Sequence, residues 1–115
     1  NVADESTSVT TFAVDIASRD YEYHVLSSPL SYSAANSFLS IVKENNLATV
    51  LGKNSSGGAS SVMTNITPSG SVFFMSSTDI MTNSNYESIE YGITVDRELS
   101  LFDITRSETV FDLLP

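Results

Sequence analysis

The sequence lacks cysteine and contains a single histidine, His24. Disulfide bonds and thiol chemistry are therefore excluded within these residues, and a zinc site is disfavoured because its usual ligands are missing. No apolar run reaches the roughly 20 residues that a bilayer-spanning helix needs. Lysine and arginine number 5 against 14 acidic residues, giving a net charge of −9. This charge disfavours nucleic acids and anionic membrane surfaces as partners. We predict neither a metal nor another cofactor.

Length and composition fit one small globular domain. The chain has 115 residues, of which 41% are hydrophobic, so it can form a core. It begins at Asn1 rather than methionine and shows no signal peptide, so we expect it to be part of a longer protein. Residues 1–20 comprise a polar lead-in and a possible strand, which alternates partly, with apolar residues at Val9, Phe12, Val14 and Ile16.

The most informative stretch, Tyr21–Gly58, predicts a strand, a sharp turn and a helix in immediate succession. Tyr23–Leu26 is typical of a buried strand, and helical spacing of apolar residues begins just after Ser33. A serine at such a junction lies beside unpaired N–H groups and the helix dipole, which stabilise negative charge. A serine nucleophile needs this environment because its attack creates an oxyanion. The alternative is that Ser33 only caps the helix.

Weaker patterns follow this stretch. Thr49–Gly52 predicts a short central strand, and the glycine pair Gly57-Gly58 allows another backbone to approach closely. From Ala59 the apolar period changes to two, which indicates a hairpin closed at Pro68-Ser69-Gly70. Downstream we predict a loop at Thr78–Glu90 and a strand at Ile93–Val95. A helix is predicted at Thr105–Leu114, capped by Thr105 and Glu108.

Four consecutive segments carry a further signal: HVLSSPLSYSAAN, SFLSIVKENN, TVLGK and NSSGGASSV. Their order and spacing resemble the C-terminal processing (tail-specific) proteases, which are serine peptidases with a ClpP/crotonase-like fold. ITPSGS resembles the Pro-Gly hairpin of that family, and YGITVDREL resembles its closing strand. The resemblance implies an α/β fold with a mixed sheet and helices, incomplete in this chain. Residues 21–99 would be the C-terminal part of the catalytic domain, and residues 100–115 a C-terminal helix.

The resemblance also implies a site. Ser33 matches the nucleophile of the family's Ser-Ala-Ser-Ala-Ser turn, which here reads Ser31-Tyr32-Ser33-Ala34-Ala35. The Ala34 N–H would then help to bind the oxyanion, and a glycine-rich segment upstream would supply the second donor. The reaction would be peptide hydrolysis through an acyl-enzyme. A peptide or protein substrate would bind as an added strand near Gly57–Ser61, contacting Gly57, Gly58 and Ala59.

Position 58 departs from the best-known members of the family, which carry a catalytic lysine in this loop. Aligning the glycines that end the second strand places Gly58 at that position. The sequence is more similar to branches such as the tricorn core, where a histidine from elsewhere acts. We therefore expect the base to lie outside this chain and the chain alone to be inactive. Lys53 is an alternative base. We expect His24 to be a partly buried strand residue and Asp96 to have a structural role.

A second functional class is compatible with the same residues. The chain would then be a non-catalytic peptide-binding or surface module that keeps the fold without the chemistry. In either class, the uncovered strands of a partial domain predict self-association into a homo-oligomer. The abundance of serine, threonine and asparagine fits an extracellular or cell-envelope-associated bacterial protein.

Overall fold

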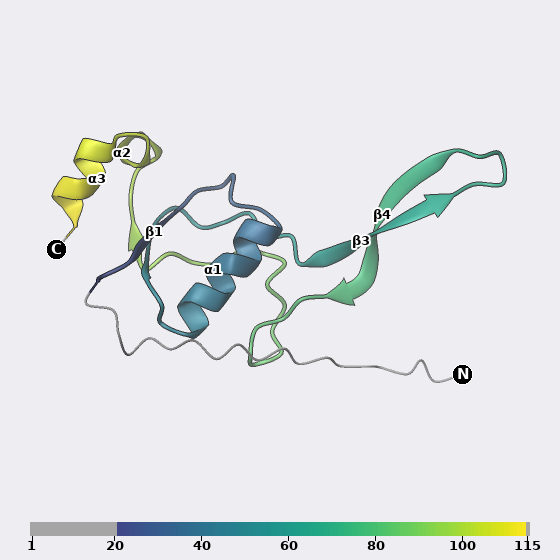
Figure 1. Ribbon diagram of the computed structural model, residues 1–115, viewed down its shortest axis with the longest axis horizontal. Coiled ribbons are helices and arrows are strands. Elements are labelled where there is room, and N and C mark those ends of the chain that lie inside the picture. The colour runs from purple at the N-terminus through teal and green to yellow at the C-terminus, as the bar shows by residue number, and fades with distance from the viewer. Residues whose placement is uncertain (1–20, 115) are drawn as a thin grey trace.

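A three-stranded parallel sheet and one helix form the centre of the molecule (Figure 1). The computed structural model describes residues 21–114, so the lead-in and strand predicted within residues 1–20 lie outside the described residues. In sheet order, the strands are β1 (His24–Ser27), β2 (Thr49–Gly52) and β5 (Arg97–Glu98). Helix α1 (Ala34–Glu44) connects β1 to β2, because parallel neighbours need a crossover.

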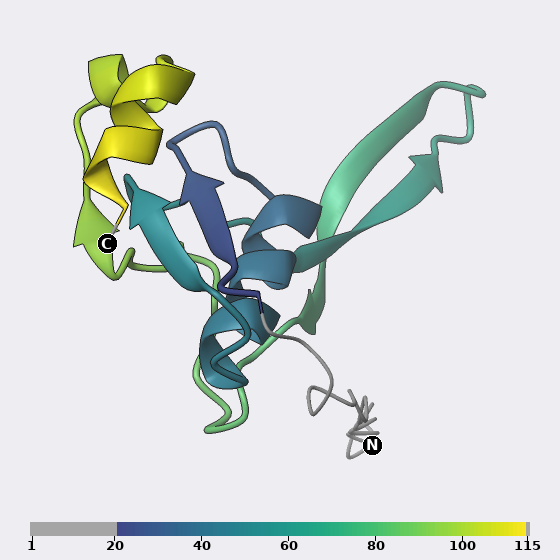
Figure 2. The ribbon, with the colours of Figure 1, turned by 60° about the vertical axis from the view of Figure 1, so that its left-hand side comes forward.

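Helix α1 lies against one face of this sheet (Figure 2), and the core lies between the two. Leu39 and Val42 of α1 are 2% exposed, and they form one buried cluster with Val50 of β2, which is fully buried. Smaller contributions come from partly buried neighbours: Val25, Leu47, Ala48, Ile93 and Val95. Burial of this apolar face stabilises α1, because an isolated helix of this length is marginal in water. The sequence predicted β2 with its observed bounds and β1 with a shift of one residue.

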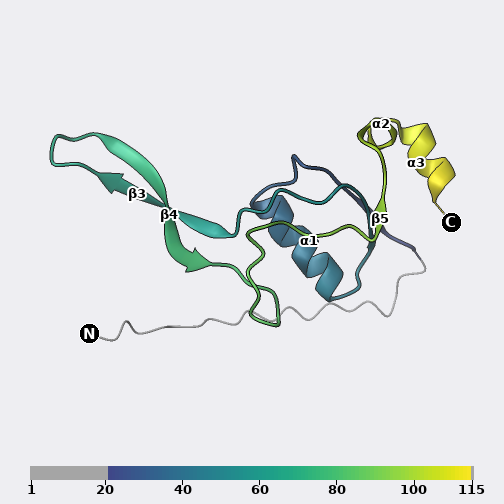
Figure 3. The same ribbon diagram turned by 180° about the vertical axis from the view of Figure 1, so that it is seen from behind.

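A long hairpin, β3 (Ser60–Ile66) and β4 (Val72–Ile80), projects from this centre, away from the C-terminal helices (Figure 3). Its turn contains Gly70 at φ +88°, where the N–H donates to the Thr67 carbonyl over 2.9 Å. The predicted loop beginning at Thr78 is wrong at its start, because β4 runs on to Ile80. There it pairs with Ser60 beyond an irregularity in β3, a pairing that the local sequence does not reveal.

The strand predicted at Ile93–Val95 is absent from the described structure. The Ile93 N–H donates to Ser55 Oγ over 2.7 Å, and the Val95 N–H donates to Asn54 Oδ1 over 3.1 Å. The side-chain oxygens of Ser55 and Asn54 thus accept hydrogen bonds from N–H groups that would otherwise bond to a neighbouring strand. Regular pairing begins only in β5, where Arg97 lies opposite Leu51.

The C-terminal helix prediction is also corrected. The helix predicted at Thr105–Leu114 is observed, slightly shorter, as α3 (Ser107–Leu113). A second short helix, α2 (Leu101–Ile104), precedes it, so the segment from residue 100 onward does not form one helix. The capping box belongs to α2, where the Asp103 N–H donates to Ser100 Oγ over 3.1 Å. Thr105 ends α2 instead of capping the next helix. No helix among residues 21–114 has the length and apolarity needed to cross a bilayer.

Candidate active site

Ser33 occupies the residue immediately before α1 in an unusual backbone conformation. Its φ of 56° and ψ of −113° lie where residues other than glycine are seldom found. The residue is exposed, and its side chain makes no capping hydrogen bond to α1. The alternative that the Ser33 hydroxyl caps the helix is therefore wrong. Strain of this kind persists only where the surrounding structure enforces it, and it is concentrated at functional sites.

The loop after β2 holds the Ser33 turn from one side. The Ser33 N–H donates to the Gly57 carbonyl over 2.8 Å, and the Ser56 N–H donates to the Ser31 carbonyl over 2.9 Å. Tyr32 forms an isolated parallel bridge with Gly57 between these two bonds. Three consecutive residues of the turn are thus tied to a segment more than 20 positions away along the chain.

Ala34 is the first residue of α1, so its N–H has no acceptor within the helix. Among the described residues no other acceptor for this N–H is found. The positive end of the helix dipole lies at the same place, because the aligned peptide dipoles leave partial positive charge at an N-terminus. A free hydroxyl at Ser33 and an unpaired N–H at Ala34 therefore stand on successive residues.

Gly57, Gly58 and Ala59 are buried, and most of their backbone groups are already bonded. The Gly58 N–H donates to the Glu90 carbonyl over 3.2 Å, and the Ala59 N–H donates to Glu90 Oε2 over 2.6 Å. The Gly57 carbonyl accepts from Ser33, and the Ala59 carbonyl accepts from Met81. An added peptide strand would have to displace these bonds. These bonds fix the three residues to the Ser33 turn and to residues 81 and 90, and their predicted contact with substrate stays a prediction.

A buried polar network that the sequence did not predict lies beneath the turn. The Asn36 side chain has no exposed surface; its Nδ2 donates to the Ile89 carbonyl over 2.9 Å. Ser55 Oγ donates to Asn36 Oδ1 over 2.6 Å and accepts from the Ile93 N–H. Both polar ends of the amide are thus satisfied, as burial requires. The available signal was the position of Asn36 one turn before Leu39, on the apolar face of the helix.

The two possible bases within the described chain, Lys53 and His24, each lie beside a glutamate, and neither is bonded to Ser33. Lys53 Nζ is paired with the Glu98 carboxylate, which lowers the pKa of Glu98. His24 is partly buried in β1, as predicted, with Nε2 3.6 Å from Glu22 Oε1. No hydrogen bond or ion pair joins either side chain to Ser33 among residues 21–114.

Asp96 has the structural role expected of it. Its Oδ2 accepts from the Val50 N–H over 2.8 Å, and its Oδ1 lies 3.0 Å from Lys43 Nζ. Partial burial alone would raise the pKa of Asp96. The hydrogen bond from Val50 and the nearby ammonium of Lys43 together outweigh it and hold that pKa below its ordinary value. The carboxylate thereby ties the closing segment to β2 and to the end of α1.

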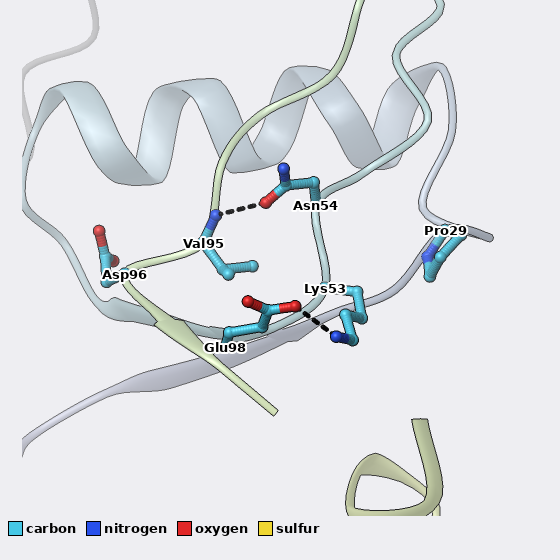
Figure 4. A pocket seen from close by; sticks show the side chains of 6 residues that line it. All are labelled: Pro29, Lys53, Asn54, Val95, Asp96 and Glu98. Atoms are coloured by element: carbon cyan, nitrogen blue, oxygen red, sulfur yellow. Dashed lines mark hydrogen bonds and ion pairs between the residues drawn. The ribbon is translucent and has the colours of Figure 1, made fainter. Parts of the chain in front are cut away.

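A polar pocket of about 490 Å³ opens at the carboxyl ends of the parallel strands (Figure 4). Figure 4 shows Lys53 and Glu98 turned toward each other and Asn54 reaching the Val95 N–H. Ligands of open α/β sheets commonly bind at this edge. Ser33 is not among the residues that line the pocket. No group of three histidine, cysteine or acidic side chains that could hold a metal ion is found in the described part of the chain.

Comparison with known proteins places this geometry in a family. The sequence matches Peptidase family S41 over residues 3–99. The fold is similar to that of a Parabacteroides merdae protein assigned as a peptidase, with a TM-score of 0.59 and 24% identity over 79% of this chain. It is also similar to mature CPAF, with a TM-score of 0.60 and 20% identity over 70% of this chain. Comparison with curated protein sequences gives no match.

The chain spans 27% of the length of the first of these structures and 16% of the second. Identities this low demonstrate the fold alone, which confirms the predicted α/β architecture of the C-terminal processing protease type. The family match covers far more than half of the residues and includes the whole sheet, α1 and the Ser33 turn. This chain therefore belongs to peptidase family S41, the family of C-terminal processing proteases.

Proposed function

We propose that this chain supplies the nucleophile of a serine peptidase, and that Ser33 is that nucleophile. The observation that carries the proposal is the strained backbone of Ser33, which presents an exposed, uncapped hydroxyl at the N-terminus of α1. Strand-to-helix turns that hold a nucleophilic serine in a strained conformation recur in hydrolases, because they expose the hydroxyl beside free N–H groups.

The chemistry follows from this arrangement. Ser33 Oγ attacks the peptide carbonyl carbon while its proton passes to a base, and the Ala34 N–H donates to the resulting oxyanion. The C–N bond then breaks, the amine leaves with the proton, and water hydrolyses the acyl-enzyme. The second oxyanion donor and the base come from other parts of the complete protein, since the chain spans only 27% and 16% of its solved relatives. The isolated chain should be inactive.

Covalent labelling tests the assignment. A fluorophosphonate probe applied to the complete protein should modify Ser33, because the probe reacts with activated serine hydroxyls. Peptide mapping of the labelled protein distinguishes Ser33 from Ser31, which lies in the same turn with its Oγ accepting from the Ser28 N–H. A label on Ser31, or none on an enzyme that hydrolyses peptides, would contradict the proposal.

A non-catalytic peptide-binding module is the second candidate. It is favoured by the absence, among the described residues, of a hydrogen bond between the Ser33 side chain and a histidine or lysine. The same labelling experiment separates the two functions. A complete protein that binds peptides but neither hydrolyses them nor reacts with the probe would be such a module.

We further propose that the hairpin of β3 and β4 mediates self-association. Its strands carry one charged residue, Asp79, while Ile66 is 70% exposed and Phe74 is 71% exposed. A two-stranded ribbon with apolar side chains on its surface is marginal alone and lacks the charges that protect strand edges. Pairing with a second copy would cover these side chains and satisfy the free edges.

We therefore expect the isolated chain to form dimers or larger species at high concentration, as measured by light scattering. Phe74→Asp should shift the population toward monomer, because a charge would then be buried in the contact. Ser69→Asp in the hairpin turn, outside both strands, serves as the matched control and should leave the distribution unchanged. A monomeric wild-type chain at high concentration would count against the proposal.

A further inference from the structure

The ring of Tyr32 covers Gly58. Gly58 is buried with φ +85°, and a Cβ added to it would lie 2.6 Å from Cζ and 2.7 Å from Cε2 of Tyr32. These distances are shorter than real Cβ atoms show, so a side chain at position 58 and the ring in its present position exclude each other. The ring therefore occupies the volume that any side chain at position 58 would need.

Tyr32 is also the residue that directly precedes Ser33. It remains 60% exposed, so one part of the ring rests on the glycine loop while much of the rest faces solvent. Its backbone forms the bridge to Gly57, next to the hydrogen bond from the Ser33 N–H to the Gly57 carbonyl. Among the described residues no hydrogen bond of the Tyr32 hydroxyl is seen. The contact with Gly58 is thus made by the ring and not by the phenol oxygen.

We propose that Tyr32 is a positioning residue for Ser33, and that the same ring closes position 58 to any proton-accepting side chain. The inference rests on the proposed role of Ser33 as nucleophile. A residue held at φ 56° needs surroundings that prevent relaxation. The backbone hydrogen bonds of residues 31 and 33 to the loop after β2 supply one part of this restraint. The ring seated on Gly58 supplies a second, steric attachment between the turn and the loop.

Two consequences follow for the site. The contact between the ring and the glycine adds to the hydrogen bonds that hold the Ser33 turn, so both positions contribute to the reactivity of Ser33. The base must approach the Ser33 hydroxyl from a direction other than position 58, because the ring fills that space. Tyr32 and Gly58 therefore form a matched pair, in which the large residue requires the small one.

The first test compares Tyr32→Phe with Tyr32→Ala in the complete protein, using the rate constant for fluorophosphonate labelling of Ser33. Tyr32→Phe should keep the wild-type rate, because it retains the ring. Tyr32→Ala should lower the rate by about 10- to 100-fold, the loss that a displaced reacting group causes. Tyr91→Ala, which removes a tyrosine that is 94% exposed, is the matched control and should have no effect. An unchanged rate in Tyr32→Ala, or an equal loss in Tyr32→Phe, would overturn the inference.

The second test is a double-mutant cycle with Gly58→Ala. In the wild-type background this change meets both the positive φ and the ring, whereas in the Tyr32→Ala background only the positive φ remains. Gly58→Ala should therefore lower the unfolding midpoint in denaturant clearly more when Tyr32 is present, as expected for residues in direct contact. Equal shifts in both backgrounds would disprove the steric coupling. This readout does not depend on labelling, so it separates a failure of the Tyr32 inference from a failure of the proposed nucleophile.

Discussion

Replacing Ser33 by alanine in the complete protein should lower the rate of peptide hydrolysis by about a thousandfold or more, the loss typical of a removed serine nucleophile. The fold should be unaffected, because the Ser33 side chain is exposed and makes no capping bond that α1 would lose. Alanine also carries a Cβ, so the cost of the positive φ is nearly the same before and after the change. The loss should therefore appear in kcat and not in the melting temperature.

Ser31→Ala is the matched control for this prediction. Ser31 lies in the same turn, but its hydroxyl oxygen accepts a hydrogen bond from the Ser28 N–H over 3.2 Å, whereas the Ser33 hydroxyl is unbonded among the described residues. Its removal should cost some stability and leave most of the hydrolytic rate. If Ser33→Ala retained hydrolysis while Ser31→Ala abolished it, the nucleophile would be Ser31 and the proposed site would be wrong.

The sequence predicted the elements around Ser33 well because each is determined locally. An apolar run gives β1, the helical spacing of apolar residues gives α1, and a short β-branched run gives β2. The Ile93–Val95 segment has the same β-branched composition and was predicted wrongly. Its N–H groups are taken by Ser55 and Asn54, 38 and 41 positions away. Local patterns contain no information about such distant side-chain acceptors.

In the candidate site, too, local features could be predicted from the sequence, whereas contacts between distant residues could not. The position of Ser33 at a strand–helix junction was visible in the sequence, but the hydrogen bond from its N–H to the Gly57 carbonyl joins it to a later loop. The bond from Asn36 to Ile89 spans 53 positions, and the contact between Tyr32 and Gly58 exists only once that loop has folded back. A glycine is a weak sequence signal until the neighbouring atom that requires it is known.

The pH response of the fold can be separated from that of the reaction. The pKa of Asp96 is lower in the folded chain than in an unfolded one, so the ionised carboxylate stabilises the fold at neutral pH. That stabilisation is present above the ordinary aspartate pKa of about 4 and is lost only as the pH falls below it. The contacts of Asp96 with Val50 and Lys43 should therefore remain intact between pH 5 and 8.

The identity of the base determines how the reaction should depend on pH. Glycine at position 58 cannot accept a proton, and Lys53 is paired with the Glu98 carboxylate and makes no hydrogen bond to Ser33 in the described structure. We therefore expect a histidine from another part of the complete protein to act as the base. The value of kcat/KM should then fall as the pH drops through about 6 to 7, where an ordinary histidine becomes protonated. The folded fraction, measured by circular dichroism, should stay constant over the same range.

Two substitutions test this assignment against the residues of the chain itself. Lys53→Met should leave both the pH profile and kcat/KM unchanged, because it removes an exposed ion pair of small energetic value. His24→Gln should alter stability more than rate, since His24 is partly buried in β1 and is not bonded to Ser33 in the described structure. Loss of activity in Lys53→Met with an intact fold would identify the lysine as the base. The histidine assignment would then have to be abandoned, because the lysine would be accepting the serine proton.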